Sequence, residues 1–271
     1  MTRSGGVIES RKQLASLLET ATVRITLAVL FLVPLIFPIG QPNHPFVELK
    51  AFVLHVGMLL AASLWLWEGA IRLRLQRQPG KTNERVSPLG WLGWSPSRWA
   101  VVALSAMWLA QIVSTILSPL PEISFYGGNE NFAGGNLYDA AALLIVFLVV
   151  AFKFRSVERL EQLAWVLIVS ATIAAAYGVA QHFGWDPLGG RTGIRVPSSF
   201  GNTINFSAYV AMAIPATIVM PFIFKRTGRV FQLSAGLALA VQMAGMLFSE
   251  SQGPYVGVLV ALLALLAGIA L

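Results

Sequence analysis

Long hydrophobic stretches separated by short polar segments run through the whole chain. A helix crosses the roughly 30 Å hydrocarbon core of a bilayer with about 20 mostly apolar residues. Eight stretches approach this length, and they lie near residues 22-39, 50-70, 99-117, 137-154, 160-181, 206-224, 230-248 and 254-271. The pattern predicts an all-α fold, a polytopic integral membrane helical bundle with about eight transmembrane helices.

The polar segments are too short to build a soluble domain, so we expect one transmembrane domain over residues 1-271. The first stretch contains Pro34 and Pro38 and is followed by no small-residue cleavage pattern, which favours a retained span over a signal peptide. The last stretch runs to Leu271 without a following loop or charged anchor. We therefore expect the sequence to be a truncated part of a longer protein.

Positive charges gather in alternate polar segments. Sixteen of the nineteen Lys and Arg residues lie before the first span or in the connections after the second, fourth and sixth spans, and only Lys50, Arg191 and Arg195 lie on the other side. The positive-inside rule therefore places the N-terminus in the cytoplasm. The net charge of +7 is then a topology signal, and we expect membrane lipids rather than nucleic acid as its partners.

Composition narrows the chemistry further. Hydrophobic residues make up 56% of the chain, and cysteine is absent. The lack of cysteine excludes disulfides and thiolate metal sites. We expect no metal and no cofactor.

A few polar and small residues interrupt the spans. His55, Gln111 and Gln242 are expected to form hydrogen bonds between helices, and Asp139 complements the positive end of the helix dipole at the start of the fourth span. Small residues allow close helix contact in lipid. They recur at Ala171, Ala174, Ala175 and Gly178 in the fifth span and at Ala235, Gly236 and Ala240 in the seventh.

Two of the predicted outer loops leave alternatives open. Residues 118–136 carry no positive charge but several glycines and asparagines, which fits either a shaped re-entrant or lid segment or a plain turn-rich loop. The outer turn at residues 248–257 contains Glu250, which serves either to keep the turn soluble or as a partner for Arg191 or Arg195.

The loop at residues 180–205 holds both outer-loop arginines, Arg191 and Arg195. Guanidinium groups bind phosphate oxygens bidentately, so their place on the translocated side points to an anionic ligand such as a phosphate-bearing lipid headgroup. The alternative is that they contact anionic phospholipid or form salt bridges with Asp186 and Glu250.

The start of the sixth span adds hydrogen-bond donors to this loop. Ser199, Asn202 and Asn205 are candidate caps, and the backbone N–H groups that follow them would face the same ligand with the positive end of a helix dipole.

Residues 177–215, "YGVAQHFGWDPLGGRTGIRVPSSFGNTINFSAYVAMAIP", carry Tyr-Gly, Gln, Gly-x-Asp-Pro, Arg, a Phe-Gly-Asn turn, Asn and a helix that ends in Pro. In this order the segment resembles the O-antigen ligase and polymerase superfamily. Two further segments are more weakly similar to the family's outer loops: "LSPLPEISFYGGNENFAGGNLYD" at 117–139 and "FSESQGPYVGVLVALL" at 248–263. The resemblance covers roughly residues 95–271.

The resemblance implies a metal-independent membrane glycosyltransferase of the bacterial cytoplasmic (inner) membrane that builds cell envelope polysaccharide. Members take a glycan from a polyprenyl diphosphate on the outer face, so a lipid-linked glycan donor is the implied partner. Arg195 matches the family's arginine ahead of the Phe-Gly-Asn turn, Arg191 is a supporting candidate, and Asn202 and Asn205 match the turn and the helix start. Arginines in such a site hold the diphosphate leaving group.

The chain also departs from the family. Gln252 stands where members have an arginine, Asn129 and Asn131 where they often have a basic residue, and neither His44 nor His182 matches the family's general base. That histidine belongs to a later outer loop, so we expect the chain as given to be inactive.

Two other functions remain open. A non-catalytic relative that serves as a structural or binding subunit, with protein partners in a larger membrane complex, fits these departures. A transporter or flippase would be expected to show paired broken helices and internal repeats, and the sequence has neither.

Overall fold

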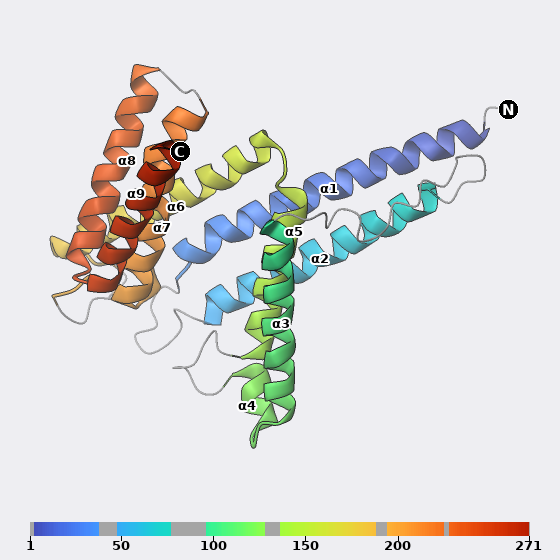
Figure 1. Cartoon of the computed structure of the whole chain (residues 1–271), viewed down its shortest axis with the longest axis horizontal. Helices are drawn as coiled ribbons and strands as arrows, with labels where there is room; N and C mark the ends of the chain where they lie inside the picture. Colours follow the sequence, from blue (N-terminus) through green and yellow to red (C-terminus); the bar gives the residue numbers. More distant parts are fainter. Residues whose placement is uncertain are drawn as a thin grey trace. The chain divides into compact units, whose positions relative to one another are not determined.

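The computed structural model of the protein describes residues 3–37, 48–76, 96–127, 136–187, 194–224 and 228–270, most of which are helical. No strand occurs among these residues (Figure 1). The helices are α1 (Arg3–Leu35), α2 (Glu48–Gln76), α3 (Pro96–Ile116), α4 (Pro121–Tyr126), α5 (Leu137–Lys153), α6 (Val157–His182), the 3-10 helix η1 (Ser198–Phe200), α7 (Thr203–Ile223), α8 (Arg229–Phe248) and α9 (Gln252–Ala270). The predicted all-α class is confirmed.

Five helical segments within the described residues are long and apolar enough to cross a membrane: Ile8–Leu35, Glu48–Leu75, Val157–His182, Thr203–Ile223 and Arg229–Phe248. The apolar segments Val102–Ile116 and Gln252–Gly268 are shorter, and α5 has 17 residues. The chain thus has the helices of a multi-pass membrane protein.

The helix that contains most of the first predicted span, near 22-39, is longer at its N-terminal end, because α1 begins at Arg3. Its polar N-terminal part continues as helix because Ala15 and Leu18 pack against Ile71 of α2. The loop predicted at 118–136 contains the six-residue helix α4, which buries none of its residues.

The described contacts divide into two compact units. Unit 1 comprises Met1–Thr26 and Leu54–Lys153, and unit 2 comprises Leu27–Val53 and Phe154–Leu271. The continuous helices α1 and α2 each belong to both units. This division therefore does not test the prediction of one transmembrane domain.

Unit 1 is held together by charged side chains at the end of α2. Glu68 is 1% exposed, and its carboxylate accepts hydrogen bonds from Arg72 Nε (2.7 Å) and from Lys153 Nζ of α5 (2.5 Å). Arg72 also donates to Glu19 of α1 (2.6 Å). Because a buried carboxylate without partners is very costly, these bonds fix α1, α2 and α5 in register. The sequence analysis did not single out Glu68.

Unit 2 is a bundle in which α8 packs against α6 and α7, and α7 also packs against α9 (Figure 1). Its core includes Ala175, Phe206 and Met246. Gln242 is 0% exposed; it donates to Thr172 of α6 (2.9 Å) and accepts from Thr217 of α7 (2.9 Å). The predicted interhelical role of Gln242 is confirmed.

Small residues bring α6 and α8 close together. A Cβ added at Gly245 of α8 would lie 2.9 Å from Ala175 Cβ and 3.0 Å from Ala175 Cα. Ala175 belongs to the small residues predicted for α6, whereas Gly245 was not among the small residues predicted for α8. Gly236 has no atom within 4 Å of its added Cβ, and it is exposed.

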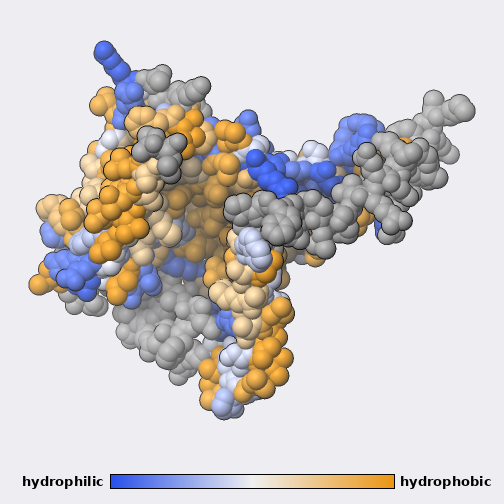
Figure 2. Space-filling view, in the orientation of Figure 1, coloured by the Kyte–Doolittle hydropathy of each residue, from blue (hydrophilic) through white to orange (hydrophobic). Residues whose placement is uncertain are grey.

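Large apolar side chains remain exposed on unit 2. Figure 2 shows hydrophobic residues on the visible surface of unit 2. The exposed leucines of α8 and α9 include Leu233, Leu237, Leu259 and Leu263, which are 57–74% exposed. Such a surface is unfavourable in water and favourable against lipid. This agrees with the membrane class inferred from the sequence.

Replacing Gly245 with Ala is expected to destabilise the protein, because the added methyl group overpacks the α6–α8 contact by about 1–3 kcal/mol. Gly236→Ala is the matched control, since both substitutions bring the same gain in helix propensity, about 1 kcal/mol. Thermal unfolding of the two purified variants measures the difference. An equal unfolding temperature for both would contradict the close contact.

Candidate functional site

Arg195 lies in the segment 194–202, between α6 and α7 of unit 2. Its Nε donates to the carbonyl oxygen of Ser249 (2.9 Å), and its Nη2 donates to the carbonyl oxygen of Glu250 (3.0 Å) and to Oγ of Ser251 (2.9 Å). These three residues form the turn between α8 and α9. All three acceptors are neutral, so none of them offsets the positive charge of the guanidinium.

Two non-glycine residues beside this contact have a left-handed backbone. The φ angle is +51° at both Ser198 and Glu250, a conformation that costs roughly 1–2 kcal/mol. Hydrogen bonds hold both residues: Arg195 binds the carbonyl of Glu250, while Ser198 donates its N–H to Gln181 Oε1 (2.8 Å) and its hydroxyl to the carbonyl of Ala174 (2.6 Å). Strain of this kind is frequent at functional sites.

Gln181, near the end of α6, links segment 194–202 to the loop that follows α6. It is 0% exposed. Its Nε2 donates to Asp186 Oδ1 at 3.1 Å, and the hydroxyl of Tyr177 donates to the same oxygen. Asp186 thus takes donors from α6, and Arg195 contacts the backbone of Glu250 rather than its carboxylate. Among the described residues, Arg195 therefore forms no salt bridge with Asp186 or Glu250, which was the alternative prediction.

Lys50, in the first turn of α2, lies against the same segment. Its Nζ is 4.5 Å from the centre of the Phe200 ring, a cation–π contact, and it donates to the carbonyl of Pro34 at 3.1 Å. The hydroxyl of Ser199 donates to the same carbonyl (2.7 Å). In a regular helix this carbonyl would accept from the residue four positions on, but that residue is Pro38, which has no N–H. The prediction of Ser199 as a helix cap is therefore wrong.

Asn202 caps α7, as predicted. Its side-chain oxygen accepts hydrogen bonds from the N–H groups of Ile204 (2.8 Å) and Asn205 (3.2 Å). Gly201 precedes it with φ +66°, a conformation that glycine adopts without strain. Asn205 is not the cap but lies exposed in the first turn of α7.

Positive charge therefore surrounds the segment 194–202. Lys50 and Arg195 contact it or belong to it, and the N-terminus of α7 follows it with the positive end of its dipole. In the part of the chain that the structure describes, neither cation forms an ion pair with a carboxylate. Cations with neutral partners beside a helix N-terminus are suited to binding phosphate oxygens.

Lys50 was not predicted as a member of this site. In the sequence it stands out only as an exception to the charge rule, and no local motif connects residue 50 with residue 200. The signal that was available is the charge rule itself, because Lys50 is one of the three cations on the predicted outer side.

Other candidates have more limited outcomes. Arg191, His44, Asn129 and Asn131 lie outside the described residues. His182 stacks on Phe248, with ring centres 3.7 Å apart. Gln252 is the first residue of α9. Among the described residues, no three His, Cys, Asp or Glu side chains are grouped as a metal site would require.

A second polar contact lies in unit 1. His55 Nε2 is 2.9 Å from Asp139 Oδ1, within ion-pair distance although it does not meet the angle of a hydrogen bond. The His55 ring stacks on Tyr138, with centres 3.9 Å apart. Asp139 also accepts from Asn136 Nδ2 (2.9 Å), while the Asn136 side chain accepts from the Asp139 N–H (2.7 Å). Asp139 lies in the first turn of α5, as predicted. His55 contacts Asp139 across α2 and α5, but the hydrogen bond predicted for His55 is not formed among the described residues.

Removing the Arg195 side chain is expected to loosen the α8–α9 turn. In Arg195→Gln the turn loses a charged donor to three acceptors, on the order of 1–3 kcal/mol and nearer the lower bound because the side chain is exposed. Hydrogen exchange of Ser249 and Glu250 should become faster. Arg74→Gln is the control, since Arg74 is an exposed arginine for which the structure shows no polar contact. Unchanged exchange in Arg195→Gln would show that the turn holds by itself.

Comparison of the chain with protein-family models, with curated proteins and with solved structures finds no match. The resemblance of residues 177–215 to a glycosyltransferase family stays a prediction. Lys50, Arg195 and the start of α7 form the most positively charged described part of unit 2 on the predicted outer side.

Proposed function

We propose that this chain is a bacterial inner-membrane protein with eight spans and a cytoplasmic N-terminus, whose unit 2 binds a polyprenyl-diphosphate-linked glycan at the outer face. In this proposal α3, α5 and α9 also cross the bilayer, which thins or adapts around short helices. The reaction class is glycan transfer of the ligase or polymerase type.

Contacts within each unit support the alternating topology. In unit 2, polar bonds join the end of α1, the start of α2, the segment before α7 and the α8–α9 turn, all of which the charge rule assigns outside. In unit 1, Glu68 pairs with both Arg72 and Lys153, which lie near the ends of α2 and α5 that the rule assigns inside. Antiparallel neighbours that alternate through a bilayer would produce such pairing.

The observation that carries the proposal is the pair of cations at segment 194–202: Lys50 contacts its Phe200, Arg195 belongs to it, and among the described residues both have neutral partners. Cations outside the membrane work against insertion, so their retention calls for an anionic partner. A diphosphate has enough oxygens to accept from both side chains, and the positive end of the α7 dipole, whose first N–H groups Asn202 caps, lies beside them.

In this site the two cations would bind the diphosphate and stabilise the negative charge that develops on it as the glycan leaves. Asn202 holds the start of α7 in place, and the exposed amide of Asn205 is available to the ligand. Arg191 remains a supporting candidate outside the described residues. No described residue is assigned as the general base.

A second function, a structural or binding subunit in a larger membrane complex, is favoured by one observation. Arg195 has a complete structural role, because its Nε and Nη2 hold the α8–α9 turn. A non-catalytic relative would keep the contact of Arg195 with the α8–α9 turn because the contact stabilises the fold.

Binding of a polyprenyl diphosphate to the purified chain is expected to weaken when either cation is neutralised. A hydrogen bond to a charged group is worth about 1.5–3 kcal/mol, so Lys50→Gln or Arg195→Gln should each reduce affinity about tenfold or more. The binding should also weaken as salt is raised.

Two controls separate charge from fold in this experiment. Arg74→Gln removes a positive charge elsewhere and should leave binding unchanged. Arg195→Lys keeps the charge but loses the planar fork, so it should bind better than Arg195→Gln. Equal binding by Lys50→Gln, Arg195→Gln and wild type, or no binding at all, would favour the structural subunit.

A further inference from the structure

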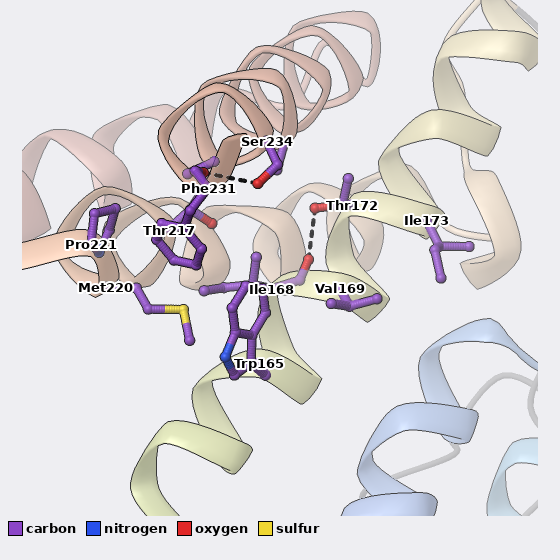
Figure 3. A pocket seen from close by; sticks show the side chains of 12 residues that line it. Trp165, Ile168, Val169, Thr172, Ile173, Thr217, Met220, Pro221, Phe231 and Ser234 are labelled. Atoms are coloured by element: carbon purple, nitrogen blue, oxygen red, sulfur yellow. Dashed lines mark hydrogen bonds between the residues drawn. The ribbon is translucent and has the colours of Figure 1, made fainter. Parts of the chain in front are cut away.

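A groove of about 220 Å³ runs between α6, α7 and α8 of unit 2 (Figure 3). Its walls are apolar, with Trp165 and Ile168 from α6, Met220 and Pro221 from α7, and Phe231 from α8. It is open to the surface of the bundle, because Val169 and Ile173, which also line it, are 38% and 46% exposed. The lining belongs to helices long and apolar enough to cross a membrane.

The sequence explains why these helices leave a gap. Small residues, Ala235 and Ala238, stand on the α8 side of the groove. On α7, Pro221 has no N–H for the carbonyl of Thr217, and its ring interrupts the regular helical packing at this point. The small side chains of α8 and the ring of Pro221 therefore leave space between the larger lining side chains Met220 and Phe231.

The hydroxyl groups in the groove are already used. Thr172 donates to the carbonyl of Ile168 (2.7 Å), Thr217 to Ala213 (2.9 Å), and Ser234 to Phe231 (2.8 Å), each within its own helix. Figure 3 shows the Thr172 and Ser234 bonds among the lining side chains. A polar ligand would find few free partners here, whereas a hydrocarbon chain needs none.

One end of the groove lies next to positive charge. Arg229 begins α8 two residues before Phe231, whose ring meets Trp165 edge to face at 5.6 Å. Lys225 and Arg226 of the α7–α8 connection lie outside the described residues and are not part of this site. The sequence at the start of α6 has two acidic residues, Glu158 and Glu161, and two basic residues, Arg155 and Arg159. Their formal charges cancel.

We propose that this groove binds one acyl chain of an anionic phospholipid, whose headgroup lies at the Arg229 end of α8. Basic groups between helices at the cytoplasmic side attract anionic headgroups, and the charge rule assigns this end of α8 to that side. The site is separate from the cations at the start of α7 and does not depend on the proposed glycan transfer.

The test uses Trp165 as a reporter in vesicles of phosphatidylcholine that contain a minor fraction of a lipid with brominated acyl chains, either phosphatidylglycerol or phosphatidylcholine. Bromine quenches a tryptophan that it contacts. The Trp165 component is obtained by subtracting the fluorescence of Trp165→Phe. We expect brominated phosphatidylglycerol to quench Trp165 more strongly than brominated phosphatidylcholine. The apparent affinity should differ about fivefold for each cation that contacts the headgroup. This preference should decrease at high salt.

Variants assign the quenching to the groove. Ala238→Phe fills it and should abolish the preference, whereas Ala240→Phe, the same change at an exposed position of α8 outside the lining, should preserve it. Arg229→Gln leaves the groove open and should lower the preference about fivefold, so the proposal stays testable if Ala238→Phe fails to fold.

Three results would overturn the proposal. Equal quenching of Trp165 by the two brominated lipids would mean that bulk lipid fills the groove without selection. A preference that survives in a folded Ala238→Phe variant would place the lipid elsewhere. Displacement of the brominated lipid by a polyprenyl phosphate more strongly than by phosphatidylglycerol would assign the groove to an isoprenoid chain.

Discussion

The fold of unit 2 depends on satisfying irregular backbone at the end of an apolar bundle. The segment before α7 and the α8–α9 turn both leave helical geometry, and an unpaired backbone group costs several kcal/mol in or near lipid. Arg195 supplies donors to the carbonyls of the turn, and Gln181 supplies an acceptor to the N–H of Ser198. These two side chains allow the left-handed residues Ser198 and Glu250 to persist. The same contact keeps an arginine charge at the surface without a carboxylate beside it.

Unit 1 meets a related constraint in another way. Its buried carboxylate, Glu68, is matched by Lys153 and Arg72, so that charges offset one another inside the unit. In unit 2 the cations Lys50 and Arg195 have only neutral partners among the described residues. This contrast is the physical basis for proposing that an anion from outside the protein completes the site.

The sequence predicted the helices well, because hydrophobic stretches of membrane length leave little alternative to a helix. It also predicted local features that short-range chemistry decides, such as Asn202 as a cap and the link from Gln242 to other helices. It failed where distant parts meet. Several features depend on residues far apart in the chain: the helical N-terminal part of α1, the Glu68 pairing and the contact of Lys50 with Phe200. Ser199 does not cap α7 because its hydroxyl donates to the carbonyl of Pro34, to which Pro38 has no N–H to donate.

The central claim is that Lys50 and Arg195 jointly contact a diphosphate. Solid-state NMR in membranes can measure it through the dipolar coupling between the phosphorus atoms of a bound polyprenyl diphosphate and ¹⁵N-labelled lysine or arginine side chains. The account predicts coupling to both residue types, with the lysine signal lost in Lys50→Gln and the arginine signal weakened in Arg195→Gln. Coupling that persists unchanged in these variants, or that is absent from the wild-type protein with the lipid bound, would contradict it.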